Sequence, residues 1–187
     1  MAEILLSSET FIKSVTNISD NVAGKHILPS LREAQDVGLR GILGDALLAA
    51  LKGMVGDHSI GDAGHEAYKD LLDRAQYYLA WTAVVEVCNR VTYKIGNFGV
   101  ARSSDENLQP VGPEELGQQQ FYYQSKADSC AVDLQNWLLN NRAQFPELTD
   151  CQCNAIRANL RSAASCGIFL GGARGRILPG GGGCCKR

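Results

Sequence analysis

Hydrophobic side chains recur at spacings of three and four residues along two long stretches, which predicts two long amphipathic helices. The first runs from about residue 66 to residue 95, and its stripe consists of Tyr68, Leu71, Leu72, Ala75, Leu79, Thr82, Ala83 and Glu86. The second runs from Pro113, suited to a first helical position, to about Arg142. Its seam consists of Leu116, Gln120, Tyr123, Ala127, Cys130, Leu134, Trp137 and Asn141. The simplest arrangement lays one helix antiparallel against the other.

Shorter helices are predicted before and after this pair. Ser7 or Ser8 caps a helix near the start, and a second helix runs to about Leu39 and either begins near Pro29 or bends there. Gly41 and Gly44 are expected to stop it, and Asp45 to cap a short helix closed by Gly53 and Gly56. Thr149 or Asp150 caps a last helix. Within the first long helix, Glu86 is expected to pair with Arg90. The fold class predicted is all-α, a helical bundle.

Two segments fall outside the helical pattern. Residues 96–112 contain three glycines and one proline and predict an extended arm or a loose hairpin. Residues 171–187 contain seven glycines and have no folding drive of their own, which predicts an extended C-terminal tail. The expected organisation is one helical domain over residues 1–170 followed by a tail over residues 171–187.

Charge is distributed unevenly between these parts. All 20 acidic residues lie at or before Asp150, whereas the basic residues after it are Arg157, Arg161, Arg174, Arg176, Lys186 and Arg187. An acidic body with a basic tail favours a tail that docks on a negative surface, and the alternative is a solvated extension. The last helix and the tail could touch DNA phosphates, but a pI of about 5.9 argues against a specific DNA reader.

No catalytic motif is present. Cys151 and Cys153, together with Cys184 and Cys185, lack the spacing of a zinc site, and the three histidines are scattered before Glu66. A thiol- or zinc-dependent enzyme stays open only as an alternative, and we expect no enzyme, cofactor or metal. The first residues lack the pattern of a secretory signal and no stretch predicts a membrane span, so reduced thiols in a cytosolic protein are expected.

The chain resembles a family of uncharacterised Bacteroidales phage and prophage structural proteins, including those of crAss-like phages. The resemblance covers most of residues 4–176. It is carried by residues 17–25, 28–29, 32–35, 42–44, 68–72, 76–80, 104–107 and 157–160, from Asn17-Ile18-Ser19-Asp20 at the start to Arg157-Ala158-Asn159-Leu160 at the end. The order of short and long helices is similar to that of head–tail connector, or adaptor, proteins of tailed phages.

This resemblance implies a virion protein, made in the host cytoplasm, that forms a ring under the portal, usually of twelve copies. It implies three kinds of neighbour: copies of itself, the portal protein, and a tail or stopper protein, with double-stranded DNA passing through the channel without sequence-specific binding. The arm would contribute Phe98, Val100, Arg102, Asp105 and Glu106. The docking tail would contribute Arg174, Arg176, Ile177, Leu178, Lys186 and Arg187. The alternatives are a tail-completion or stopper protein and a DNA-binding packaging factor.

Overall fold

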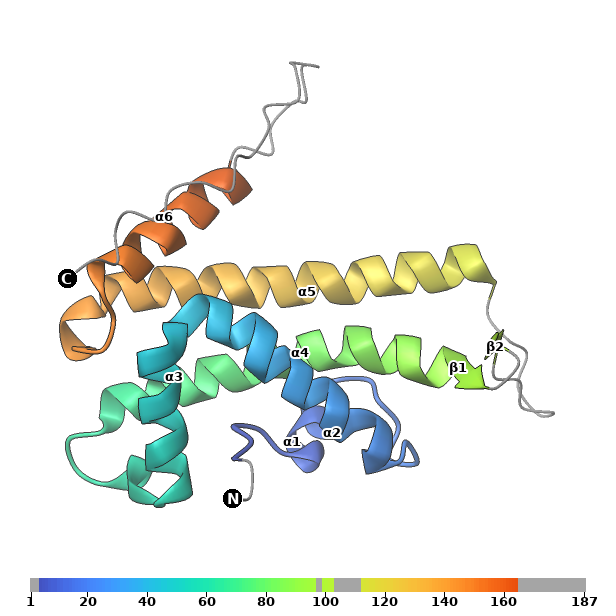
Figure 1. Cartoon of the computed structure of the whole chain (residues 1–187), viewed down its shortest axis with the longest axis horizontal. Helices are drawn as coiled ribbons and strands as arrows, with labels where there is room; N and C mark the ends of the chain where they lie inside the picture. Colours follow the sequence, from blue (N-terminus) through green and yellow to red (C-terminus); the bar gives the residue numbers. More distant parts are fainter. Residues whose placement is uncertain (1–3, 97–98, 103–111, 165–187) are drawn as a thin grey trace, which may run out of the picture.

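The computed structural model describes residues 4–96, 99–102 and 112–164, and this part of the chain is helical apart from one small hairpin (Figure 1). The order is α1 (Glu9–Val15), α2 (Gly24–Glu33), the π-helix η1 (Ala34–Leu39), α3 (Arg40–Gly56), the 3₁₀ turn η2 (Ser59–Gly61), α4 (Glu66–Thr92), β1 (Tyr93–Gly96), β2 (Gly99–Arg102), α5 (Pro113–Asn140), the 3₁₀ turn η3 (Arg142–Gln144) and α6 (Asp150–Ala164). The predicted all-α class is confirmed.

The two longest helices, α4 and α5, lie side by side (Figure 1). Arg74 of α4 donates to Asp133 of α5 at 2.8 Å, and Asn89, further along α4, accepts from Gln120, earlier in α5, at 2.6 Å. A later residue of α4 thus pairs with an earlier residue of α5, so the two helices are antiparallel. Both predicted helices therefore exist, and Pro113 is the first residue of α5 as expected.

Helix α4 is the centre of the core. It contacts α1, α2, η1 and α5, and its side chains at Leu71, Ala75, Leu79 and Ala83 are fully buried. Burying a leucine side chain stabilises a fold by about 1.5–3 kcal/mol, so this stripe explains why so many elements gather on one helix. The largest fully buried side chains elsewhere are Leu6, Ile12, Ile27, Leu31, Leu39, Leu43, Leu47, Leu51, Leu134 and Phe145.

The expected arm begins as an antiparallel hairpin. Strands β1 and β2 pair Tyr93 with Arg102 and Gly96 with Gly99, so the last predicted residues of the first long helix belong to a strand. Of the predicted arm residues, Val100 and Arg102 lie in β2. Phe98, Asp105 and Glu106 lie outside the described residues.

The helical path from α2 to α3 differs from the prediction. Pro29 lies inside α2, and the helix continues through Gly41, so neither residue breaks it. The break falls at Gly44, whose φ of 78° and ψ of 167° lie in a region that only glycine adopts without strain. Asp45 pairs with Arg40, and the second half of α3 passes Gly53 and ends at Gly56.

Two glutamine side chains hold the N-terminal segment against the core. The backbone N–H of Leu6 donates to Oε1 of the buried Gln35 at 2.8 Å, and Nε2 of Gln35 donates to the Ile4 carbonyl at 3.1 Å. Gln76 of α4 donates to the Leu6 carbonyl at 2.8 Å. The N–H and the carbonyl of the buried Leu6 and the carbonyl of Ile4 are therefore satisfied.

Candidate interaction surface

A groove of about 610 Å³ runs between α4 and α5. Its lining comes from one face of each helix and consists of Asp70, Asp73, Arg74, Tyr77, Ser129, Cys130 and Asp133. Arg74 crosses the groove to Asp133, and its guanidinium lies 5.2 Å from the centre of the Trp137 ring. The Tyr77 ring packs edge-on against Phe11 of α1. The groove thus has an aromatic wall and a rim of carboxylates.

The rim carries excess negative charge. Asp133 is neutralised by Arg74, but within the described ranges neither Asp70 nor Asp73 has an ion-pair partner. Both side chains belong to exposed residues on consecutive turns of α4. Two unpaired carboxylates beside apolar surface are suited to a basic ligand that also carries apolar side chains.

Cys130 is the cysteine that lines this groove, and its thiol is not activated for nucleophilic attack. Cys130 is half-buried, and burial raises the pKa of its thiol, as it does for the pKa of Cys88 on α4. A raised pKa keeps the thiol protonated near neutral pH, whereas reactive cysteines have lowered values. Of the cysteines considered for zinc, Cys153 is fully buried in the core and Cys151 is exposed, and no metal-binding cluster occurs among the described residues. Cys184 and Cys185 lie outside them.

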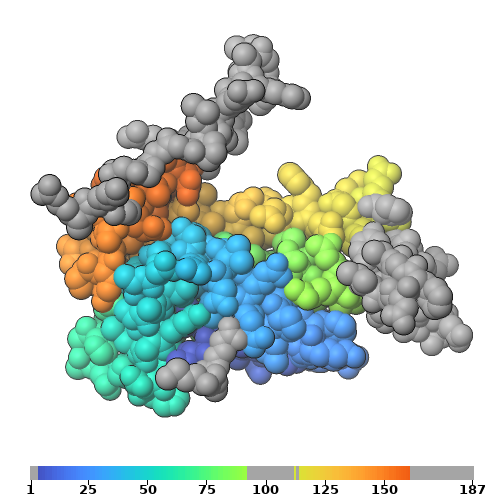
Figure 2. Space-filling view, viewed as in Figure 1, coloured from blue at the N-terminus to red at the C-terminus, as the bar shows by residue number. Residues whose placement is uncertain are grey.

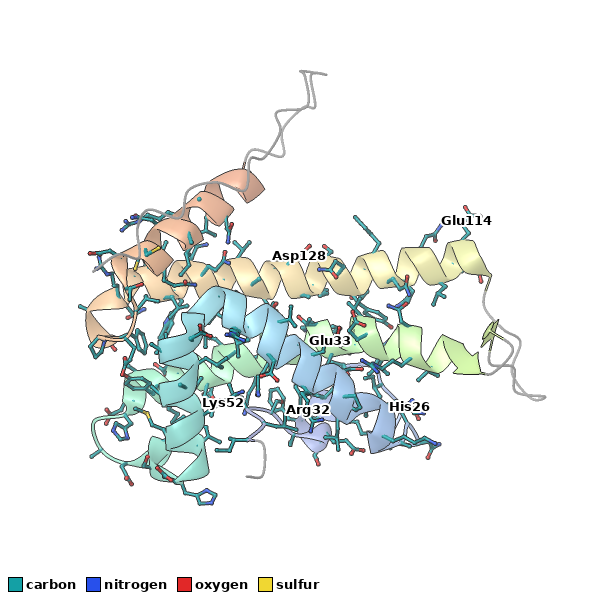
Figure 3. The ribbon with its side chains drawn as sticks, viewed as in Figure 1. His26, Arg32, Glu33, Lys52, Glu114 and Asp128 are labelled. Carbon is teal, nitrogen blue, oxygen red and sulfur yellow. The ribbon has the colours of Figure 1, made fainter. Side chains whose placement is uncertain are left out.

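A second surface is the outer side of α5, turned away from α4. Phe121 is 75% exposed and Tyr122 is 50% exposed. A shallow depression next to them is lined by Phe121, Gln124, Ser125, Asp128, Ser129 and Val132. Figure 2 shows the first half of α5, in yellow, at the molecular surface, and Figure 3 labels Asp128 midway along the helix. We call Tyr122 and the residues that line this depression the α5 outer stripe. Large exposed aromatic side chains on a rigid helix are typical of contact sites with other proteins.

A third feature is the joint between α3 and α6. Nε2 of Gln152 donates to the carbonyls of Gly41 at 3.1 Å and Ile42 at 2.8 Å. These two carbonyls lie just before the break at Gly44, and the α6 side chain gives both of them a hydrogen-bond partner. A shallow depression surrounds the joint, and the side chain of Val37 on its edge is 73% exposed.

The predicted tail residues lie outside the described residues: Arg174, Arg176, Ile177, Leu178, Lys186 and Arg187. The expected pair between Glu86 and Arg90 is wrong, because Arg90 pairs with Glu33 of α2 at 2.8 Å. The α2 carboxylate lies across a helix interface and competes successfully with the neighbour one turn away. On α6, Arg157 is exposed and its side chain contacts Asn154.

The carboxylates of the groove were not predicted from the sequence. Asp70 and Asp73 are three residues apart on one helix, and Asp133 belongs to the flank of the other. The spacing of Asp70 and Asp73 indicates that these two residues share one face of a helix. That Asp133 lies opposite them depends on the register between the two helices, which no local pattern gives.

A model of a family of unknown function, DUF6712, matches residues 39–158 of the 187 residues. The chain belongs to the DUF6712 family. The matched part includes α3, α4, the hairpin, α5 and the first half of α6, so the DUF6712 region holds the groove, the α5 outer stripe and the joint. No curated protein and no solved structure matches the chain. In the described part of this DUF6712 protein, no helix has the length and apolar character required to cross a membrane.

Proposed function

We propose that this chain is a structural subunit of the head–tail connector of a tailed phage, where copies form a ring under the portal. The subunit would extend the DNA channel and offer its lower face to a tail or stopper protein. The role is assembly rather than catalysis, and its place is the virion.

The observation that carries the proposal is the α5 outer stripe on a long antiparallel helix pair. A rigid helix that exposes Phe121 and Tyr122 gains stability when another surface covers these rings. In a closed ring every copy gives and receives the same contact, so a modest interface is repeated around the ring and dissociation of one copy breaks two contacts. A tail that also docks on the portal adds avidity.

Charge on the body supports the passage of DNA without tight binding. All 20 acidic residues of the chain lie at or before Asp150, so the body carries net negative charge. Phosphates are repelled by such a surface, so DNA would slide past it.

The proposal is tested with full-length protein and with a chain that lacks residues 171–187. We expect both to show the same helical circular dichroism, and only the full-length chain to join purified portal particles in sedimentation. Normal joining by the shortened chain would remove the docking role of the tail.

The exposed Arg157 on α6 and the basic residues after it favour one second candidate, a DNA-binding packaging factor. Titration with double-stranded DNA at several salt concentrations separates the two functions. A packaging factor binds DNA with a steep loss of affinity as salt rises, whereas a connector subunit binds little at any salt concentration.

A further inference from the structure

We propose that the groove between α4 and α5 receives residues 174–178 of a neighbouring copy of this chain, so that the basic tail of one subunit joins it to the next. This inference rests on the proposed ring, since the ring places a second copy alongside. It leaves Lys186 and Arg187, further along the tail, for the portal.

The chemistry of the two partners is complementary. The groove offers the unpaired carboxylates of Asp70 and Asp73 beside the ring of Tyr77. Residues 174–178 read Arg-Gly-Arg-Ile-Leu, so two guanidinium groups are followed directly by two branched apolar side chains. Guanidinium groups form paired hydrogen bonds with carboxylates, and the apolar side chains would cover the aromatic wall. No acidic residue follows Asp150, so nothing in the segment opposes this attraction.

The length of chain after α6 is sufficient for the tail to reach a neighbouring copy. Helix α6 rises away from α5 toward its end at Ala164 (Figure 1). Ten further residues lead to Arg174, and an extended chain covers at most about 3.3–3.6 Å per residue. The segment can therefore bridge roughly 30 Å outward from the body, which is on the order of the width of a small domain.

Cys130 in the groove provides a reporter for the contact. In full-length protein with Cys88, Cys151, Cys166, Cys184 and Cys185 changed to serine, the cysteines left are Cys130 and the fully buried Cys153. Leu178→Cys then places a single thiol in the tail. Copper phenanthroline, as the oxidant, is expected to link this position to Cys130 of another copy and to give covalent dimers and longer chains on a non-reducing gel. Mildly alkaline buffer is needed, because burial raises the pKa of the Cys130 thiol.

A mixture of two variants shows whether the disulfide joins two copies or forms within a single chain. One chain carries Leu178→Cys with Cys130→Ser, and the other keeps Cys130 without the tail cysteine. A mixed covalent dimer supports the proposal. A link found only within a single chain, or a dimer yield that persists after Cys130→Ser in both chains, overturns it.

Charge reversal tests the recognition itself. Asp70→Lys with Asp73→Lys is expected to lower the yield of linked dimers about tenfold, since two partly exposed ion pairs together contribute on the order of 1.4 kcal/mol. Arg174→Asp with Arg176→Asp in the same chain should restore the yield. The matched control is Asp57→Lys with Asp62→Lys, which makes the same change of charge at exposed residues outside the groove and should leave the yield unchanged. Equal losses in both double variants would overturn the proposal.

The mass of the same samples, measured with portal present, separates this inference from the proposed function. Intact rings without a link to Cys130 would overturn the groove contact and leave the connector role standing. A chain that forms no assembly at all would overturn the connector role and the groove contact with it.

Discussion

The two ends of the α4–α5 pair are built in different ways. At the end that leads into η3, Phe145 is 1% exposed and packs edge-on against Tyr68, with ring centres 5.2 Å apart. Its ring also lies tilted against that of Trp137, at 5.7 Å. Toward the hairpin end, Gln120 donates to Asn89 and Tyr123 stacks on Trp81, with ring centres 6.3 Å apart. Phe121, next to them in the chain, points into solvent. We call these the aromatic end and the hairpin end.

The difference separates stability from assembly. Aromatic rings at the aromatic end are covered by the chain itself, so they stabilise the subunit. The ring of Phe121 at the hairpin end is left uncovered, so it contributes little to the subunit and is free to contribute to a contact. The same residue type therefore has two different roles according to what surrounds it.

The strongest contrast in stability is expected when one phenylalanine is removed at each end of the helix pair. Phe145→Ala should lower the free energy of unfolding by about 3–5 kcal/mol, because it opens a cavity in the core. Phe121→Ala should change it by about 0.5 kcal/mol or less, because the ring is exposed. Urea denaturation followed by circular dichroism measures both. A similar loss of unfolding free energy in the two variants would show that the two ends do not differ in their contribution to stability.

A middle effect is expected at the joint that ties α6 to α3. Gly44→Ala should cost about 1–3 kcal/mol, because alanine is strained at a φ of 78°. Gly41→Ala is the matched control: a Cβ there meets nothing within 4 Å, and the residue is helical, so stability should rise by up to about 1 kcal/mol. Thermal melts of the two variants give the comparison. A loss at Gly41 as large as that at Gly44 would contradict the position of the break.

The smallest effect concerns a single hydrogen bond at the aromatic end. Burial and the bond from Tyr68 to Glu147, 2.8 Å long, raise the pKa of Tyr68 to about 12. Since the folded value exceeds the unfolded value of 10.0, this stabilisation is complete below pH 10 and is lost as pH rises through about 12.

Tyr68→Phe should therefore cost about 0.5–1.5 kcal/mol near pH 7 and should flatten the loss of stability between pH 10 and pH 12. Urea denaturation across this pH range measures both quantities. An alkaline loss that is the same in the variant and the parent protein would assign it to another group, such as Tyr78, whose pKa is also raised by burial.

The helix pair could be predicted from sequence because its period is local. The spacing of Leu71, Ala75 and Leu79 can be recognised within one short segment of the sequence. All three side chains are buried in the structure. Pro113 fixed the start of α5 because its missing N–H is tolerated at a first helical position. These features need no knowledge of distant parts of the chain.

The break in α3 and the groove depend on distant residues and were not predictable in this way. The local sequence does not distinguish Gly41 from Gly44 as the place of the break, which occurs at Gly44. Next to this break, Gln152 donates to the carbonyls of Gly41 and Ile42 from more than a hundred residues away. The carboxylates of the groove come together only through the register of α4 against α5. Gln35 likewise holds an N-terminal segment whose fixation no local pattern indicates.

Assembly of this subunit into a closed ring is tested by the mass of the full-length protein mixed with portal particles. We expect one discrete species that adds an integer multiple of the 20.2 kDa subunit to the portal, with the same number of copies on every particle. A protein that stays at 20.2 kDa at every concentration, alone and with portal, would show that no ring forms.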